Sequence, residues 1–215
     1  MYGPLIILGA CGFAREVFCY TSWYGYNGIY LYDEFIDQEF IRVAGHNVPT
    51  LKNFGKLSIW HPRSQCVFVV GVGNPDVKEK LVSKALTQGL KPAPTIVAGG
   101  VGCHDHNKIG FGGVICPGVQ ITTNVTIGDY VTLNLNTTIG HDAVIEDFVT
   151  TSPGCHISGN VVLSKKVFLG SGAVVKEKVK VAEGVTIGAQ AYVAKDALDE
   201  GVTLVGVPAK KLEKQ

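Results

Sequence analysis

The sequence predicts an α/β head followed by a left-handed parallel β-helix of hexapeptide repeats, and three features carry this prediction. In steps of six from Ile109 to Val193, 14 of 15 positions are Ile, Leu or Val, and only Thr151 differs. Four residues after these positions, from Val119 to Ala197, every residue is Val, Ala, Thr or Cys. The first 95 or so residues instead alternate short apolar runs with amphipathic stretches.

A fixed period of six excludes an α-helix, which needs 3.6 residues per turn, and a plain alternating strand. It is typical of a parallel β-helix, in which each hexapeptide makes one short strand and a turn. Three hexapeptides then form a triangular coil of 18 residues, so the fifteen give five coils. Glycines after the aliphatic position, such as Gly140 and Gly170, are expected to adopt turn angles that other residues resist.

The head, residues 1–95, reads as a small Rossmann-like βαβαβ unit, and the trunk, residues 96–215, carries the β-helix and a short tail. In the head, Asn74 and Pro75 predict a helix start, with Asn as N-cap. That helix should bury a face of Val77, Leu81, Ala85 and Leu86. The other elements expected in the head are, in order, strands at 5–8 and 29–32, a helix over 13–24, a strand at 66–70 and a final strand near 95–97.

Two loops of the head are suited to phosphate, because ligands of open α/β sheets lie beyond the carboxyl ends of strands, at helix N-termini. The first loop is Gly9-Ala10-Cys11-Gly12, and the second includes Gly73 and Asn74. Asp33, after the second strand, can accept a hydrogen bond from a ribose or base. The glycines are also compatible with simple tight strand-to-helix turns. NAD is disfavoured because the G-x-G-x-x-G spacing is absent.

Composition limits the partners and the compartment. With 19 basic and 18 acidic residues, the chain shows no basic excess for nucleic acid and no charge run for a membrane surface. The apolar run at 5–8 is far too short for a signal peptide or a membrane span. Six cysteines without a CxxC pair favour reduced thiols. We therefore expect a cytoplasmic protein.

His141 is the main candidate for chemistry in the trunk. It occupies the third, outward position of its hexapeptide, and residue 159, one coil further on, is a glycine that leaves room for the ring. Pro153, Ser171 and Ala189 form a neighbouring outward column of small residues. A lone outward histidine more often serves surface or interface packing. Asp142 beside it shifts the balance, because a carboxylate can orient an imidazole and support the imidazolium formed in catalysis.

These residues also carry a resemblance. The segment from Asn134 to Phe148 with its Ile-Gly-His-Asp core, together with Ser152-Pro-Gly154 and 168–172, resembles bacterial sugar O-acyltransferases of the sialic-acid O-acetyltransferase type. This family includes N-acetyltransferases of nucleotide-linked 4-amino-sugars in the bacillosamine, perosamine and viosamine pathways. The loop at 9–12 and the tail Val-Gly-Val-Pro-Ala-Lys at 205–210 match at both ends.

The resemblance implies an acetyl-CoA-dependent N-acetyltransferase of a nucleotide-linked amino-sugar, most simply a 4-amino-4,6-dideoxy sugar, assembled as a homotrimer and without a metal. His141 is then the general base and Asp142 its orienting partner. The sugar nucleotide is expected at Gly9, Ala10, Cys11, Gly12, Asp33, Gly73, Asn74 and Asn134. Acetyl-CoA is expected at Thr150, Gly159, Ser171, Ala189, Gly206, Pro208 and Lys210.

Two positions depart from many relatives, which have histidine where this chain has Phe13 and Thr150. O-acetylation of a sialic acid or another sugar hydroxyl stays an alternative, because a general base serves either nucleophile. A γ-type carbonic anhydrase needs three histidines on zinc, and the outward candidates His104, His106, His141 and His156 have unsuitable spacing. A catalytically inactive scaffold is the remaining class.

Overall fold

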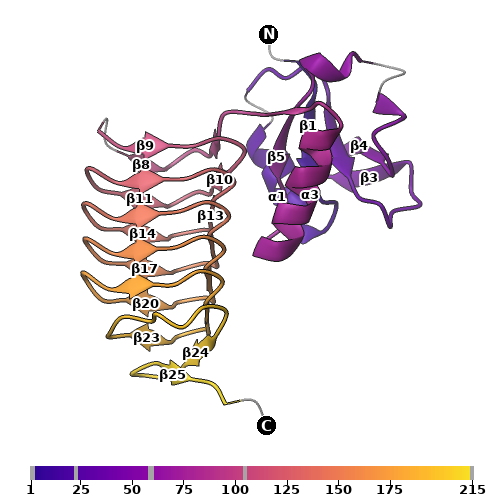
Figure 1. The fold of residues 1–215 in the computed structure, drawn as a ribbon. Coiled ribbons are helices and arrows are strands. Elements are labelled where there is room, and N and C mark those ends of the chain that lie inside the picture. The colour runs from indigo at the N-terminus through magenta and orange to yellow at the C-terminus, as the bar shows by residue number, and fades with distance from the viewer. Residues whose placement is uncertain (1–2, 22–23, 58–60, 104–105, 214–215) are drawn as a thin grey trace.

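The computed structural model describes residues 3–21, 24–57, 61–103 and 106–213, and it confirms an α/β head joined to a parallel β-helix (Figure 1). The head is built on one sheet with the strand order β3-β4-β2-β1-β5-β6, parallel except for the β3–β4 hairpin. Its elements are β1 (Leu5–Leu8), α1 (Gly12–Thr21), β2 (Ile29–Tyr32), β3 (Phe40–Val43), β4 (His46–Leu51), a 3-10 helix (Arg63–Gln65), β5 (Val67–Val70), α3 (Pro75–Thr87) and β6 (Lys91–Pro92).

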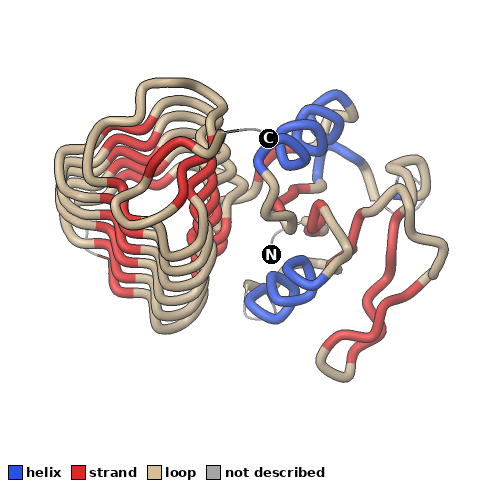
Figure 2. Tube along the Cα trace, turned by 90° about the horizontal axis from the view of Figure 1, so that it is seen from below, coloured by secondary structure: helices blue, strands red, loops and turns tan. Residues whose placement is uncertain are grey.

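Helices cover both faces of the head sheet (Figure 2). Alternate residues of a strand point to opposite faces, so Leu5 and Ile7 pack with α1, whereas Ile6 and Leu8 pack with α3. The hairpin of β3 and β4 was not anticipated from the sequence. Its two strands are joined by a tight turn in which Ala44 has φ 47° and Gly45 has φ 85°.

The trunk consists of three parallel sheets whose strands pair with the strand 18 residues further on, as in Val114 with Thr132. The first sheet contains β7 (Ile96–Val97), β10 (Val114–Ile115), β13 (Thr132–Leu133), β16 (Thr150–Thr151), β19 (Phe168–Leu169), β22 (Thr186–Ile187), β24 (Thr203–Val205) and the antiparallel β25 (Lys210–Lys211). The second contains β8 (Gly102–Cys103), β11 (Gln120–Ile121), β14 (Thr138–Ile139), β17 (His156–Ile157), β20 (Val174–Val175) and β23 (Tyr192–Val193). The third contains β9 (Lys108–Ile109), β12 (Thr126–Ile127), β15 (Val144–Ile145), β18 (Val162–Leu163) and β21 (Lys180–Val181).

The trunk begins earlier than the repeat pattern showed. The strand expected near 95–97 is β7, and it pairs with β10 rather than only leading into the trunk. The aliphatic and small positions fill one continuous core along the prism. Thr151, which breaks the pattern, is fully buried there, and its hydroxyl lies 2.9 Å from that of Thr137. The pair satisfies both hydroxyls, since leaving one unpaired would cost roughly 1–3 kcal/mol.

The turn glycines have a different purpose from the one expected. Left-handed backbone occurs at the fourth position of the hexapeptide, where most residues are not glycine, as at Asp142 with φ 59°. Glycine at the second position is needed for close stacking of coils. A Cβ on Gly140 would lie 2.4 Å from the Gly159 nitrogen, and one on Gly170 would lie 2.6 Å from the Ala189 nitrogen.

One corner of the prism packs against the head. Phe68 of β5, Tyr130 and Phe148 stack in a row, with ring centroids 6.1 and 5.0 Å apart. One coil beyond Phe148, Lys166 forms ion pairs with Glu79 of α3 at 3.2 Å and with Glu183 of the trunk at 3.5 Å. Aromatic stacking and charge pairing therefore hold the head to the trunk along α3.

The buried face of α3 differs from the predicted one. Asn74 caps the helix as expected, accepting from the Val77 N–H at 3.0 Å. Ala85 is buried and Leu81 is partly buried, as predicted. Val77 and Leu86 are nearly half exposed, however, and the other buried positions are Pro75, Lys78 and Val82. The predicted face is the one that would pack on the head sheet alone. In the structure α3 lies between the head sheet and the trunk, so it is buried on the trunk side as well.

Candidate active site

His141 and Asp142 lie on the turn that follows β14. The His141 Nδ1 is 2.7 Å from an Asp142 carboxylate oxygen, and the histidine side chain is 60% exposed. With a carboxylate accepting at Nδ1, the neutral ring carries its proton there. Nε2 is then the unprotonated nitrogen, and it can accept a proton from a substrate.

Asn124 is a second partner of Asp142 that the sequence reasoning missed. It lies one coil earlier in the same column, and its side-chain amide donates to Asp142 Oδ1 at 3.3 Å. The hydrogen bond from His141, and then the one from Asn124, lower the pKa of the Asp142 carboxyl. The carboxylate therefore stays ionised at neutral pH and keeps the histidine ring oriented.

Gly159 stacks directly over the imidazole, as the 18-residue spacing predicted. A Cβ at this position would lie 2.7 Å from His141 Nε2 and 2.8 Å from Cε1. Within the described residues, the Gly159 N–H donates no hydrogen bond. An unprotonated ring nitrogen thus lies close to Gly159, a residue whose backbone N–H is available to a ligand.

Asn134 is held by the buried threonine that breaks the repeat. Its backbone N–H donates to Thr151 Oγ1 at 3.0 Å, and its side-chain oxygen accepts from the Leu135 N–H at 2.8 Å. With that oxygen engaged, the side-chain amide group of Asn134 is the part available to a ligand. Asn134 lines the cleft between head and trunk.

This head–trunk cleft has a volume of about 650 Å³. Gly73 and Asn74 line it from the head, and Asn134, Thr150 and Lys166 line it from the trunk. Phe13 also lines it, so the two positions that depart from many relatives, 13 and 150, meet in the same cleft. Thr150 itself is buried, and its hydroxyl accepts a hydrogen bond from Lys78. Its assignment to acetyl-CoA stays a prediction.

The remaining predicted residues of the head lie elsewhere. Gly9, Cys11 and Asp33 line a sheet-edge cleft of about 780 Å³ on the other side of α3, together with Tyr32, Glu34, Phe35, Val72, Val77, Lys80, Leu81, Ser83 and Lys84. Ala10 is buried, and Gly12 lines neither cleft. The first predicted nucleotide loop therefore opens into the sheet-edge cleft, whereas the second contributes Val72 to that cleft and Gly73 and Asn74 to the head–trunk cleft. Sequence order alone did not show this division.

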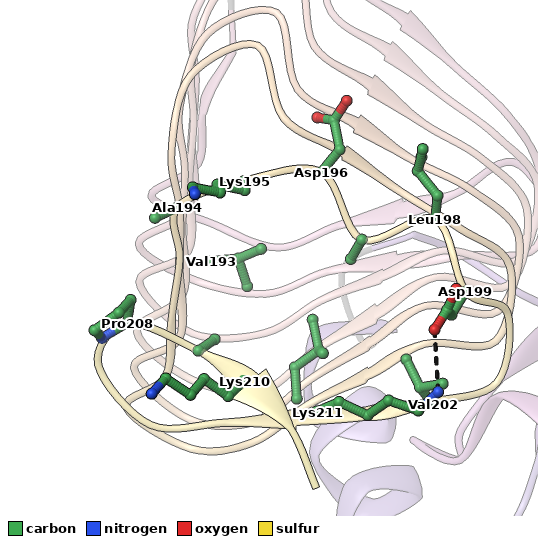
Figure 3. Close-up of a pocket in the computed structure, with 13 residues that line it drawn as sticks. Val193, Ala194, Lys195, Asp196, Leu198, Asp199, Val202, Pro208, Lys210 and Lys211 are labelled. Carbon is green, nitrogen blue, oxygen red and sulfur yellow. Dashed lines mark hydrogen bonds and ion pairs between the residues drawn. The ribbon is translucent and has the colours of Figure 1, made fainter.

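The far end of the trunk holds a third cleft of about 550 Å³ (Figure 3). Pro208 and Lys210 line it, and Lys211 forms an ion pair with Asp199 at 3.0 Å. Gly206 is not part of its lining, and its carbonyl accepts from the Tyr192 N–H at 3.0 Å. Ser171 and Ala189 are exposed on trunk turns outside this cleft.

His141 lines none of these three clefts. In the described part of the chain, no three His, Cys, Asp or Glu side chains are grouped closely enough to hold a metal ion. His156 is paired with the Thr138 hydroxyl at 2.9 Å, and His104 lies outside the described residues. Among the described residues, no helix combines the length and the apolar character that a membrane span requires.

Known proteins resemble this chain both in the head alone and over its whole length. Residues 4–85 match the family described as the PglD N-terminal domain. A GDP-perosamine N-acetyltransferase of Escherichia coli O157:H7 is 34% identical over 87 residues, which is 40% of this chain and 39% of that relative. The match to this curated relative thus spans about two fifths of its length.

Solved structures extend the likeness over the whole chain. The acetyltransferase domain of PglB from Neisseria gonorrhoeae FA1090, in complex with acetyl coenzyme A, superposes with a TM-score of 0.86 at 28% identity, covering 99% of this chain and 100% of that one. WeeI from Acinetobacter baumannii AYE gives 0.85 at 27% identity, covering 98% and 100%. Residues 4–85 therefore match the PglD N-terminal domain, and the whole chain is similar to the acetyltransferase domain of PglB.

Proposed function

We propose that this protein transfers the acetyl group of acetyl-CoA to the amino group of a nucleotide-linked amino-sugar. A 4-amino-4,6-dideoxy sugar is the substrate we favour, because a curated relative acts on GDP-perosamine. The observation that carries the proposal is the oriented His141 ring with Nε2 open and close to Gly159. A structural relative that binds acetyl coenzyme A supports the choice of donor.

The reaction follows from this geometry. The amine attacks the thioester carbonyl carbon and forms the C–N bond, while His141 Nε2 accepts the proton that the amine loses. The Gly159 N–H donates to the oxygen on which negative charge develops. The C–S bond then breaks, and the imidazolium returns its proton to the CoA thiolate. No step of this sequence uses a metal.

The proposal is tested by thiol release from acetyl-CoA against UDP-, GDP- and dTDP-linked 4-amino-sugars. At least one of them should release CoA and gain an acetyl group that resists hydroxylamine, as an amide does. A hydroxylamine-sensitive product would show O-acetylation instead. Absence of release with the whole panel would contradict an aminosugar acetyltransferase.

We further propose a homotrimer in which a second copy supplies the other wall of the site. His141 is exposed in the single chain, and the outward side chains of Val162, Val174 and Tyr192 are only half buried. Closed symmetric assembly would cover such a surface. Light scattering should give three times the chain mass, and a stable monomer at micromolar concentration would refute the shared site.

We propose that residues 1–95 bind the nucleotide, and Gly12→Val tests this assignment. Gly12 begins α1, and an added Cβ would meet no atom within 4 Å, so the fold should tolerate a side chain there. Valine would obstruct an anion at the helix N-terminus. We expect calorimetry to show at least tenfold weaker sugar-nucleotide binding, with acetyl-CoA binding unchanged. Equal loss of both ligands in a folded variant would contradict the assignment.

A further inference from the structure

Lys78 is a fully buried amine between the head and the trunk. Four acceptors lie within hydrogen-bond distance of its Nζ: the hydroxyls of Thr150 at 2.7 Å and Thr132 at 3.0 Å, and the carbonyls of Tyr130 at 3.0 Å and Val149 at 3.4 Å. The three protons of an ammonium can serve the three nearer ones. All four acceptors are neutral, and none of the described carboxylates forms an ion pair with it. Buried charges are normally paired, so a buried ammonium without a counter-ion calls for a reason.

The two hydroxyls that accept from Lys78 also line the head–trunk cleft. A hydroxyl has one proton to donate and two lone pairs. When the oxygen accepts from the ammonium, its own proton is directed elsewhere, and no described group accepts the proton of Thr132 or Thr150. Gly73 lies across the cleft from the Thr150 methyl group, since its Cβ would be 4.0 Å from Thr150 Cγ2. Two nearly buried threonines at the edge of the cleft thus have hydroxyl protons without an acceptor among the described residues.

We propose that Lys78 is a positioning residue whose ammonium group directs the Thr132 and Thr150 hydroxyls into the head–trunk cleft, where they bind phosphate oxygens of the nucleotide-linked sugar, an assignment that rests on the function proposed above. The bound anion supplies the counter-charge that the buried amine lacks. Lys166 lines the same cleft, where it forms ion pairs with Asp76, Glu79 and Glu183, and Glu16 lines the cleft too. The proposal therefore depends on the two hydroxyls and on Lys78 behind them.

The protonation state of Lys78 sets the number of donors in the cleft. A neutral amine has a lone pair, and one threonine proton would turn back to donate to it. Burial lowers the pKa of Lys78 from 10.5 to about 7, and an anion bound nearby favours the charged form. None of the charged groups on the surrounding elements contacts the Lys78 amine. These groups are Glu16 of α1, Asp76 and Glu79 of α3, and Asp129, Asp147, Lys166 and Glu183 of the trunk.

The sign of the pH effect follows. Above pH 7 the free protein holds Lys78 increasingly neutral, whereas the complex holds it charged, so binding takes up a proton. Affinity for the sugar nucleotide should therefore fall as pH rises from about 7 to 9. A loss of about tenfold is expected, which is the size of a lost hydrogen bond to a charged ligand.

The test compares wild type with Lys78→Arg, Lys78→Met and Thr150→Val. Calorimetry measures binding of GDP, UDP and dTDP, which lack the sugar amine, at pH 6.5 and pH 9 and in two buffers of different ionisation enthalpy. The matched control is Lys91→Met, which replaces an exposed lysine of β6 and should behave as wild type. Acetyl-CoA, which also carries a diphosphate, is titrated separately and should show no dependence on Lys78.

We expect wild type to take up a proton on binding and to weaken about tenfold by pH 9. Lys78→Arg, which cannot lose its charge, should bind with little pH dependence, and Lys78→Met should bind about tenfold more weakly at pH 6.5. In turnover with the sugar nucleotide, Lys78→Met should raise KM and leave kcat within about twofold. Thr150→Val keeps the lysine and the shape, and it should weaken nucleotide binding even where Lys78→Met does not fold.

Three results would overturn the assignment. They are the same pH dependence in Lys78→Arg as in wild type, unchanged nucleotide affinity in a folded Lys78→Met, or a Lys78 effect on acetyl-CoA alone. Each is distinguishable from failure of the proposed function, because that failure is the absence of wild-type turnover with every sugar nucleotide. The second of these results, together with a lowered melting temperature, would show that the role of Lys78 is structural.

Discussion

His141→Ala should lower kcat by about 10²- to 10⁴-fold, the usual contribution of a general base. The variant removes Nε2, the atom placed to accept the amine proton. The fold should be retained, because the ring is exposed. Ground-state binding of both substrates should change little, because neither needs the imidazole until the proton moves. Steady-state thiol release with the best sugar nucleotide measures kcat and both KM values.

Two companion variants sharpen this result. Asp142→Asn should cost less than His141→Ala, because the base remains and only its orientation and the stabilisation of the imidazolium are lost. His156→Ala, a second exposed histidine on the trunk that pairs with Thr138, is the matched control and should keep wild-type kcat. If His141→Ala retains more than about a tenth of kcat, below the lower end of the expected effect, another group is the base.

The trunk was predictable because its determinants are local and repeat. A large aliphatic residue every sixth position, with a small one four residues later, leaves one way to bury both sets. The same 18-residue spacing placed Gly159 over His141, both at the third position of the hexapeptide. It also places Asn124 one coil before Asp142, at the fourth position, so this contact could have been predicted in the same way. The roles of the glycines were misassigned, because a period shows where a residue recurs and not which atoms crowd it.

The head was less predictable because its determinants are distant in sequence. Lys78 looks like a solvent-facing residue on an amphipathic helix, and only the presence of Thr132 and Thr150, more than fifty residues later, shows why it is buried. The same reason explains the misassigned face of α3. Thr151 was visible as the one exception in the repeat, yet its purpose depends on Thr137 and on the Asn134 backbone across the coil.

Gly159→Ala should lower kcat by about a hundredfold while leaving stability close to wild type. The added methyl carbon would lie 2.7 Å from His141 Nε2 and 2.8 Å from Cε1, closer than such atoms can approach, so the ring must move. That movement costs little in folding because the imidazole is exposed and gives up only its surface hydrogen bond to Asp142. It is costly in catalysis, where a displacement of about 1 Å can reduce the rate 10²-fold.

This variant separates the position of the base from the oxyanion donor, because alanine keeps the backbone N–H that glycine offers. Gly99→Ala is the control, since Gly99 has ordinary backbone angles and an added Cβ would meet nothing within 4 Å. The measurements are kcat, the acetyl-CoA KM and the melting temperature of each variant. An expected outcome is a large loss of kcat for Gly159→Ala alone, with similar melting temperatures. Full activity in Gly159→Ala would mean that the orientation of His141 against Gly159 is not the one used in the reaction, and the base would have to work from a different rotamer.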